Sequence, residues 1–392
     1  MNSNSSKQEF FLSHDLVYGV LTWLPAKSLM RFKNVCKLWN TQIAHNNCFI
    51  ECHKNRLRPG TPTFSISCQT KNLRQVSFFS VKEEEKDIVH MYTKRLEDHP
   101  LLRVSCVFDG LVCFFNRNNA TICNLSTHEC FTLPPPCHNY PFTDYLVSFY
   151  AIGYDPMDKL YKVLHIWEYV HGDQKFYEVI TLSTTHNNTT RRKLNPPPWV
   201  LGHTMPSHNI CINGTIYLAC FTKVPHYQYE FQIILGFDVG DEKFQMLRLP
   251  NSLHFAKYNN IPILELDGCL AVAQLKYDHR KLKHEIKVMK LEDVENEIWV
   301  TESTIVLPYQ GKPGKYFAPH FLASVHFLTL TSSGEIMLLM EVYNQGLRVL
   351  SYDRATKIFT DLDFMNELFK DVSIRKSMVR IHNYVENIMR LP

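Results

Sequence analysis

The chain has 392 residues, of which 45% are hydrophobic, 20% charged and 12% aromatic. This is the composition of an ordinary soluble globular protein with core material for two or three domains, and it excludes a fibrous or disordered chain. The net charge of +4 at pH 7 is too small for a dedicated nucleic-acid binder, so we expect no nucleic-acid partner.

The first ten residues are polar, and we predict that they form a disordered N-terminus. They lack the apolar segment of a signal peptide, and no stretch of 18 apolar residues follows that could span a membrane. Most of the twelve cysteines stand inside apolar strings, without any C-x-x-C pair. We therefore expect free thiols in a protein of the reducing nucleus and cytoplasm.

Two apolar stripes with helical spacing lie between residues 12 and 56. The first contains Leu16, Val17, Val20, Leu21 and Leu24, and the second contains Leu29, Phe32, Val35, Cys36, Trp39 and Ile43. Ser13 is a suitable N-cap for the first helix, and Pro25 ends it. About three short helices in about 45 residues carry more apolar surface than they can bury among themselves. Either the rest of the chain or another protein must cover the surplus.

The order of residues in this segment is specific: Leu-Pro-Ala-Lys-Ser-Leu at 24–29, Arg-Phe at 31–32, Val-Cys-Lys at 35–37, then Trp39. It resembles the F-box motif of plant F-box proteins, except that Ser13 follows Leu12 where the family usually has proline. The resemblance implies docking to a Skp-type adaptor and, through it, to a cullin-based ubiquitin ligase. The expected adaptor contacts, with Trp39 and Leu29 as energetic anchors, are Leu12, Leu16, Val20, Leu24, Pro25, Leu29, Val35, Cys36 and Trp39. The alternative is a helical cap that packs only on its own chain.

From about residue 58 the pattern changes to short β-rich strings, and a turn that ends in glycine recurs before a buried strand. The four turns are Asp109-Gly110, Asn213-Gly214, Asp267-Gly268 and Ser333-Gly334. A tight hairpin needs such residues because its central positions take positive φ.

An acidic or amide residue follows each turn, with an aromatic residue six or seven positions later. The pairs are Asp238 with Phe244, Asp353 with Phe359, Asn124 with Phe131 and Glu292 with Trp299. Repeats of about 50 residues are typical of propeller blades, with kelch repeats nearest in period. We predict an all-β propeller-like domain of five or six blades after the small helical domain; a pair of β-sandwiches is the alternative.

Several strings in this region also resemble the F-box-associated domain of plant F-box proteins. They include Phe108-Asp109-Gly110-Leu111, Gly153-Tyr154-Asp155-Pro156 and Tyr352-Asp353. Where that family usually has Trp-Asn-Pro, this chain has Cys123-Asn124-Leu125, so we expect a different loop there. The resemblance implies an F-box domain at 11–57 and an F-box-associated domain at 58–392 that holds a target protein.

The sequence offers no catalytic motif and no cofactor site. Cys48, Cys52 and His53 lack a second ligand pair at zinc spacing, so we expect no metal. Residues 311–315 imitate the end of a P-loop, but tyrosine follows where serine or threonine is needed. The basic run at 277–287 is interrupted by acids and is typical of an exposed hairpin.

These observations predict a non-catalytic substrate-recognition subunit of a Skp–cullin–F-box ubiquitin ligase. Two alternatives stay open: a propeller enzyme of the oxidase or sialidase type, and an adaptor-binding interaction protein that acts without cullin. The residues that bind the target are unknown at this point.

Overall fold

The structure is a computed structural model of the whole chain. It describes residues 13–56, 63–70, 75–82, 87–95, 103–116, 119–136, 146–169, 175–183, 189–197, 208–223, 230–250, 253, 262–278, 283–307, 322–330, 334–342, 346–362, 368 and 379–392. The polar segment 1–10 and the P-loop-like residues 311–315 lie outside the described residues.

The N-terminal region forms four helices, one more than predicted: α1 (His14–Leu21), α2 (Ala26–Phe32), α3 (Lys37–His45) and α4 (Asn47–Arg56). The predicted N-cap is confirmed, because the Ser13 side chain accepts a hydrogen bond from the Leu16 amide at 3.3 Å. Asn46 explains the extra helix. Its Oδ1 accepts from the Phe49 amide at 3.1 Å, so the chain stops after α3 and starts again as α4.

The rest of the chain forms six four-stranded antiparallel sheets. From inner to outer strand, these blades are β24 (Arg380–Asn383), β1 (Thr63–Gln69), β2 (Gln75–Lys82), β3 (Asp87–Arg95); β4 (Arg103–Val104), β5 (Leu111–Phe115), β6 (Ala120–Asn124), β7 (Cys130–Thr132); β8 (Leu146–Asp155), β9 (Leu160–Tyr169), β10 (Lys175–Leu182), β11 (Thr190–Lys193); β12 (Asn209–Ile212), β13 (Thr215–Lys223), β14 (Glu230–Asp238), β15 (Phe244–Arg248); β16 (Ile263–Leu266), β17 (Cys269–Asp278), β18 (Lys283–Asp293), β19 (Ile298–Val306); and β20 (Leu322–Leu330), β21 (Ile336–Val342), β22 (Gly346–Tyr352), β23 (Phe359–Asp361).

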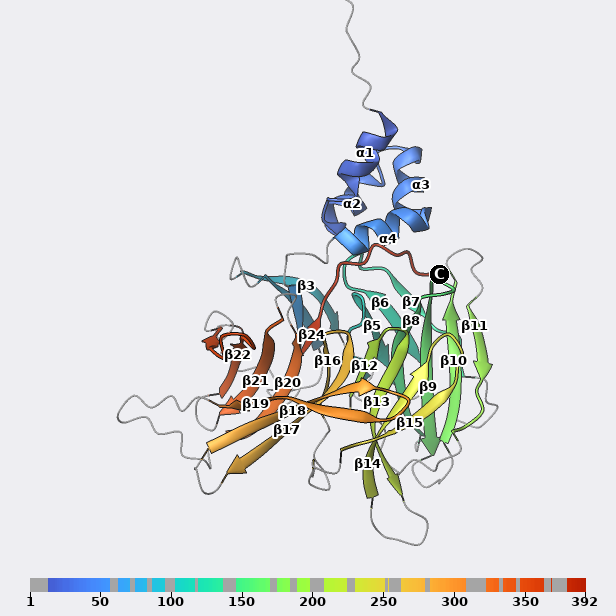
Figure 1. Cartoon of the computed structure of the whole chain (residues 1–392). Coiled ribbons are helices and arrows are strands. Elements are labelled where there is room, and N and C mark those ends of the chain that lie inside the picture. The colour runs from blue at the N-terminus through green and yellow to red at the C-terminus, as the bar shows by residue number, and fades with distance from the viewer. Residues whose placement is uncertain are drawn as a thin grey trace, which may run out of the picture.

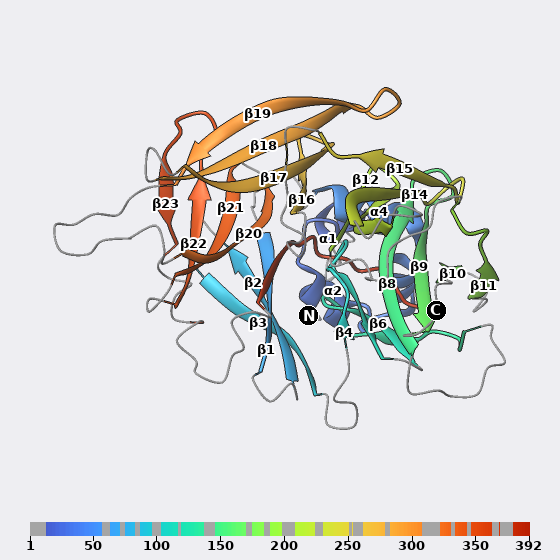
Figure 2. The same cartoon turned by 90° about the horizontal axis from the view of Figure 1, so that it is seen from below.

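The blades stand in a ring, which Figure 2 shows from below. The ring closes through two distant parts of the chain, because the late strand β24 pairs with β1 from Phe64↔Asn383 to Ser67↔Arg380. The first blade therefore takes its inner strand from residues near the end of the sequence. The architecture confirms the predicted propeller, fixes the number of blades at six and rules out the pair of β-sandwiches.

The apolar core of the ring is divided between neighbouring blades. Each of six buried clusters joins side chains from two adjacent sheets, as predicted for sheets that cannot bury both faces alone. Between the first two blades, for example, the rings of Phe78 and Phe114 meet edge to face at 5.9 Å. A separate seventh cluster holds the four helices together.

The glycine turns join the first and second strands of their blades. Both central residues have positive φ at Asp109-Gly110 (47° and 71°), Asn213-Gly214 (47° and 82°) and Asp267-Gly268 (52° and 77°). This is the backbone of the tight hairpin turn, so the prediction is confirmed at these three sites. At the fourth site Gly334 also has positive φ, whereas Ser333 lies outside the described residues.

The acidic and amide residues begin the turns between the third and fourth strands. The Asp238 Oδ1 atom accepts from the Asp241 amide at 2.7 Å, and the Asp353 Oδ1 atom accepts from the Ala355 amide at 2.8 Å. In the fifth blade the prediction was off by one residue: Asp293, not Glu292, accepts from the Asn296 amide. A side chain must be short to bond the backbone of its own turn, and the glutamate is too long.

The four helices lie over one end of the ring, and a segment with little regular structure passes between the two (Figure 1). This segment, residues 384–392, follows β24 and is called the strap below.

Candidate functional site

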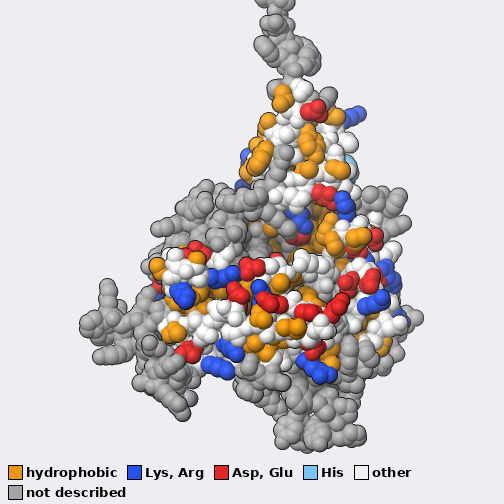
Figure 3. Space-filling view, viewed as in Figure 1, with side chains coloured by type: hydrophobic (Ala, Val, Ile, Leu, Met, Phe, Trp, Pro, Cys, Tyr) orange, Lys and Arg blue, Asp and Glu red, His pale blue; other side chains and the backbone are white. Residues whose placement is uncertain are grey.

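The helical domain carries an unusual amount of exposed apolar surface. Ten large hydrophobic side chains are exposed among the residues that the structure describes, and five of them belong to the four helices and their turns. These five, called the helical apolar surface below, are between 53% and 66% exposed: Leu16, Val20, Trp23, Val35 and Leu38. Figure 3 shows hydrophobic side chains gathered over the helices on the viewed face.

The nine residues predicted to contact an adaptor separate into groups by exposure. Leu24 and Trp39 are half-buried, Leu29 is buried, and Leu12 lies outside the described residues. The other five are exposed: Leu16, Val20, Pro25, Val35 and Cys36.

Leu29 was predicted to be an energetic anchor of the adaptor contact, but in this structure it belongs to the helical core. It is fully buried in a cluster with Ile43 and Phe49. Trp39 lies at the edge of that core, where its ring meets Phe32 edge to face at 5.5 Å. Both residues therefore support the exposed positions from beneath.

Two members of the helical apolar surface, Trp23 and Leu38, were missed from the sequence. Trp23 stands seven positions after Leu16 and three after Val20, which is the spacing of one helical face. The signal was therefore present, but the predicted stripe ended on Leu24 instead. Leu38 follows Val35 at the same spacing of three.

The strap is part of the helical core and caps one of its helices. Ile388 is buried within the helical cluster. The Glu386 Oε2 atom accepts from the Ala26 amide, the first amide of α2, at 2.8 Å. That amide has no partner within its own helix, so a carboxylate from near the end of the sequence completes the start of α2.

A buried polar cluster ties α4 to the ring and to the strap. Lys54 forms an ion pair with Asp109 and donates to the Tyr161 hydroxyl at 3.2 Å. The Tyr161 hydroxyl donates to Asp109 Oδ2 at 3.1 Å, and Asn387 of the strap donates to the Asp109 carbonyl at 2.9 Å. Burial, followed by the Asp109 charge, raises the pKa of Tyr161 well above its usual value, so its hydroxyl stays a donor.

The turn between β6 and β7 is a second attachment point for the strap. Asn124 Nδ2 donates to the carbonyls of Asn387 and Met389 at 2.9 and 3.0 Å. Glu129 accepts from the Leu391 amide at 3.3 Å and forms an ion pair of 3.5 Å with Lys33 in the turn after α2. The strap and the helical domain are thus held by the same few residues of the second blade.

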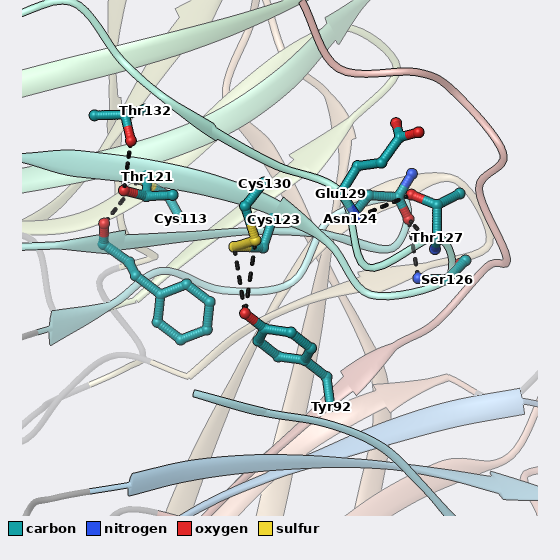
Figure 4. Close-up of a disulfide and its surroundings, with 11 residues drawn as sticks. Tyr92, Cys113, Thr121, Cys123, Asn124, Ser126, Thr127, Glu129, Cys130 and Thr132 are labelled. Carbon is teal, nitrogen blue, oxygen red and sulfur yellow. Dashed lines mark hydrogen bonds between the residues drawn. A yellow bond between two sulfur atoms is a disulfide. The ribbon is translucent and has the colours of Figure 1, made fainter. Parts of the chain in front are cut away.

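This turn was expected to differ from its family, but its backbone follows the pattern of the other blades. The Asn124 Oδ1 atom accepts from the amides of Ser126 and Thr127, like the acid that begins the other turns. The difference lies in the residue before it. Cys123 is joined to Cys130 by a disulfide across the two strands (Figure 4). The expectation that all cysteines are free thiols is therefore wrong for this pair.

A cavity of 1480 Å³ lies where the helical domain meets the central channel of the ring. Its lining includes Arg31 of α2, His208 beside β12 and His382 of β24. The His382 Nδ1 atom accepts from the Val107 amide at 3.4 Å, and its Nε2 donates to Ser67 Oγ at 3.1 Å. Burial, with smaller contributions from His208 and Arg380, lowers the pKa of His382 to about 3, so its imidazole is neutral.

A serine, a histidine and a glutamate align across the third blade in the order of a hydrolase triad. His165 lies 3.5 Å from Ser148 Oγ and 3.2 Å from Glu178 Oε2. Ser148 is buried between blades rather than among the lining residues of the cavity, and Arg191 binds the same glutamate oxygen. The ring of Tyr150 stacks on His165 at 4.1 Å. A substrate has no route to this serine, so the row holds the sheet together.

No group of three histidine, cysteine or acidic side chains is placed to hold a metal within the part of the chain that the structure describes. The residues weighed for zinc are used otherwise, since His53 Nε2 is hydrogen-bonded to the Leu24 carbonyl at 2.8 Å. Among the described helices, none is long and apolar enough to cross a membrane.

Comparison with known proteins finds matches over both regions. A family model described as the F-box domain matches residues 11–51, and one described as the F-box associated beta propeller domain matches residues 63–388. The F-box protein At4g19940 of Arabidopsis thaliana is 27% identical over 83% of this chain and 78% of its own length. The putative F-box protein At5g42430 of the same plant is 27% identical over 95% of this chain and 89% of its own length. The F-box/kelch-repeat protein At4g19930, also from Arabidopsis thaliana, is 28% identical over 76% and 70%.

Proposed function

The chain belongs to the F-box proteins that carry an F-box-associated β-propeller domain, and from this membership we propose that it is the substrate-recognition subunit of a Skp–cullin–F-box ubiquitin ligase. In this role the F-box domain, residues 11–57, binds a Skp-type adaptor and through it a cullin. The propeller domain, residues 58–392, binds the target protein. The subunit makes and breaks no bonds; it raises the concentration of the target near the ubiquitin-loaded enzyme, in the nucleus and cytoplasm.

The observation that carries this proposal is the contrast between the two sides of the F-box domain. One side is covered by its own chain, through Ile388, Glu386 and the Lys54 cluster. The helical apolar surface is left exposed in a region of 44 described residues. Exposed apolar area of this density marks a protein–protein contact, and the adaptor is the partner that the family membership implies.

We place the target site on the face of the propeller that points away from the F-box domain. The near end of the channel is occupied by the F-box domain and the strap (Figure 1). The turns on that side are short hairpins such as Asn213-Gly214 and Asp267-Gly268. The long connections from the fourth strand of one blade to the first strand of the next start on the opposite side. Long surface connections on a rigid scaffold are where recognition residues concentrate.

A matched pair of substitutions tests the adaptor contact. Val20 and Ile358 are equally exposed at 61%, but Val20 lies on the F-box domain and Ile358 on the propeller. Val20→Ala should weaken binding of the purified full chain to a Skp-type adaptor by about 1–2 kcal/mol, roughly tenfold in Kd, because truncated interface residues lose buried contact area. Ile358→Ala should leave the Kd unchanged. Isothermal titration calorimetry measures both.

Equal effects of the two substitutions would contradict the proposed contact surface. The same titration repeated with a preassembled adaptor–cullin complex separates two cases. Binding to both the adaptor and the complex supports a ligase subunit. Binding to the adaptor but not to the complex would support an interaction protein that acts without cullin.

A further inference from the structure

The turn at residues 124–129 links three parts of the molecule that are far apart in sequence. Within it, Asn124 and Glu129 hold the strap, and Glu129 also holds Lys33 of the F-box domain. Ser126 adds two more bonds, because its hydroxyl accepts from the Asn387 amide at 3.0 Å and lies 2.8 Å from the Tyr384 hydroxyl. Any change in the rigidity of this turn is therefore felt by the strap.

The Cys123–Cys130 disulfide encloses this turn and nothing else. The two cysteines face each other in the register of β6 and β7, with Cα atoms 4.2 Å apart and seven positions between them in sequence. The residues between them are the six of the turn. A covalent link at its base limits the conformations that the turn can adopt when it opens.

The two sulfur atoms differ in access. Cys130 is exposed on the outer strand of its blade, whereas Cys123 is fully buried on the neighbouring strand. The Tyr92 hydroxyl, on β3 of the adjacent blade, lies 3.8 Å from the Cys123 sulfur and 3.6 Å from the Cys130 sulfur (Figure 4). Burial raises the pKa of Tyr92, so this hydroxyl is a proton donor that can serve either sulfur.

We propose that Cys123 and Cys130 form a redox-sensitive site, oxidised by glutathione disulfide, that sets how firmly the strap and the F-box domain are held to the propeller. The exposed Cys130 thiolate attacks glutathione disulfide, releases one glutathione and keeps the other as a mixed disulfide. The Cys123 thiolate then attacks the Cys130 sulfur and displaces the second glutathione. In total the two protein thiols lose two electrons and two protons, and one glutathione disulfide becomes two glutathione molecules.

In the oxidised state the turn is covalently closed and the strap is held as the structure shows. In the reduced state β6 and β7 stay paired, but the turn opens more easily and the bonds to the strap exchange with water. A protein that works among reduced thiols would start in this looser state. It would be tightened when the glutathione pool becomes oxidised.

The test uses the full chain in a series of glutathione buffers from fully reduced to fully oxidised. Alkylation and mass spectrometry follow the peptide that contains both cysteines, which loses two hydrogens on oxidation. We expect its oxidised fraction to rise across the series. A pair that stays reduced, or stays oxidised, in every buffer would overturn the proposal.

Hydrogen exchange at the two ends of the series tests the mechanical part. The amides of Asn387 and Leu391 bond directly to the turn, so peptides from residues 384–392 should exchange about tenfold faster in the reduced state. Peptides over the equivalent turn of the sixth blade, at Asp353, should not change. Equal exchange of the strap in both states would show that the disulfide does not act on it.

Two variants complete the test. The double variant Cys123→Ser with Cys130→Ser should show fast strap exchange in every buffer, whereas Cys48→Ser, which removes a different exposed cysteine, should behave as the parent chain. Tyr92→Phe keeps both thiols but removes their shared donor. It should slow the exchange reaction and shift its pH profile, which a purely packing role for Tyr92 would not do. No adaptor is present, so these results are independent of the proposed ligase function.

Discussion

The propeller and the F-box domain treat their apolar residues in opposite ways. The propeller closes into a ring, and each blade hides both apolar faces against its neighbours in six shared cores. The F-box domain has one small core of six buried residues, one of which is supplied by the strap. In spite of its size it exposes as many large hydrophobic side chains as all the described residues of the propeller together.

The difference teaches that exposed apolar residues are informative only against the background of their own domain. Single exposed residues such as Met157 and Ile358 on the ring are ordinary surface positions. In the F-box domain the exposed residues lie directly above a core that is barely large enough to hold four helices. A surface of this kind is stable in solution only as a partner site.

The largest expected effect comes from removing a core side chain from each region. Leu29 in the F-box domain and Leu164 in the propeller are both fully buried. Replacement by alanine should cost about 2–5 kcal/mol at either site. In Leu29→Ala the loss should be confined to the helices, whose amides between residues 14 and 56 should exchange rapidly while the strands stay protected. Leu164→Ala should instead lower the denaturation midpoint of the ring.

Hydrogen exchange combined with denaturant unfolding distinguishes these patterns. If Leu29→Ala left the helices protected and weakened only adaptor binding, Leu29 would be a contact residue, as the sequence first suggested. The comparison between a self-contained ring and a dependent helical domain would then need revision at that position.

Acid should affect the ring through His382. Its folded pKa of about 3 lies below the ordinary value of 6.5, so between these two pH values the unfolded chain binds a proton that the folded chain does not. The free energy of unfolding should therefore fall with falling pH, by about 1.4 kcal/mol per unit and by about 2 kcal/mol at pH 5. His382→Gln should remove this slope. His90→Gln, at an exposed position on β3, should keep it, and denaturant titrations from pH 7 to pH 5 measure both.

The smallest effect isolates the contact between the ring and the strap. Gly110 and Gly268 occupy the same place in two hairpins, with φ of +71° and +77°. Alanine should cost about 1 kcal/mol at either glycine, because an L-residue is strained there. At Gly110 the new Cβ would also lie 2.7 Å from the Val385 carbonyl, whereas at Gly268 the nearest atom is 4.0 Å away. Gly110→Ala should therefore melt at a lower temperature than Gly268→Ala. Identical melting temperatures would mean that the strap yields without cost.

The sequence predicted the parts of the fold that repeat or that follow local rules. The helical stripes, the Ser13 cap and the positive-φ turns depend on residues a few positions apart. The repeating turns implied blades, although the choice between five and six depended on β24, a strand of four residues that pairs only with a distant β1. Glu292 was chosen over Asp293 because both are acidic, and only the geometry of the turn separates them.

The junction could not be predicted because each of its contacts joins residues far apart in the chain. Glu386 and Ala26 are 360 positions apart, and nothing local to Ala26 indicates that its amide will be capped from there. Leu29 was assigned to the adaptor surface since helical spacing shows which residues share a face, but not which face is covered. The cysteine pair escaped notice because its spacing matches no common motif and its partner is fixed only by the strand register.

The pairing of α2 with the strap also orders events on the ribosome. Translation produces the four helices first, but the carboxylate that caps α2, the sixth member of the helical core and the inner strand of the first blade are all made more than 300 residues later. A nascent chain therefore has neither a finished F-box core nor a closed ring. Premature termination before residue 380 would remove both at once, so a fragment without a complete target-holding ring would also be a poor competitor for the ligase.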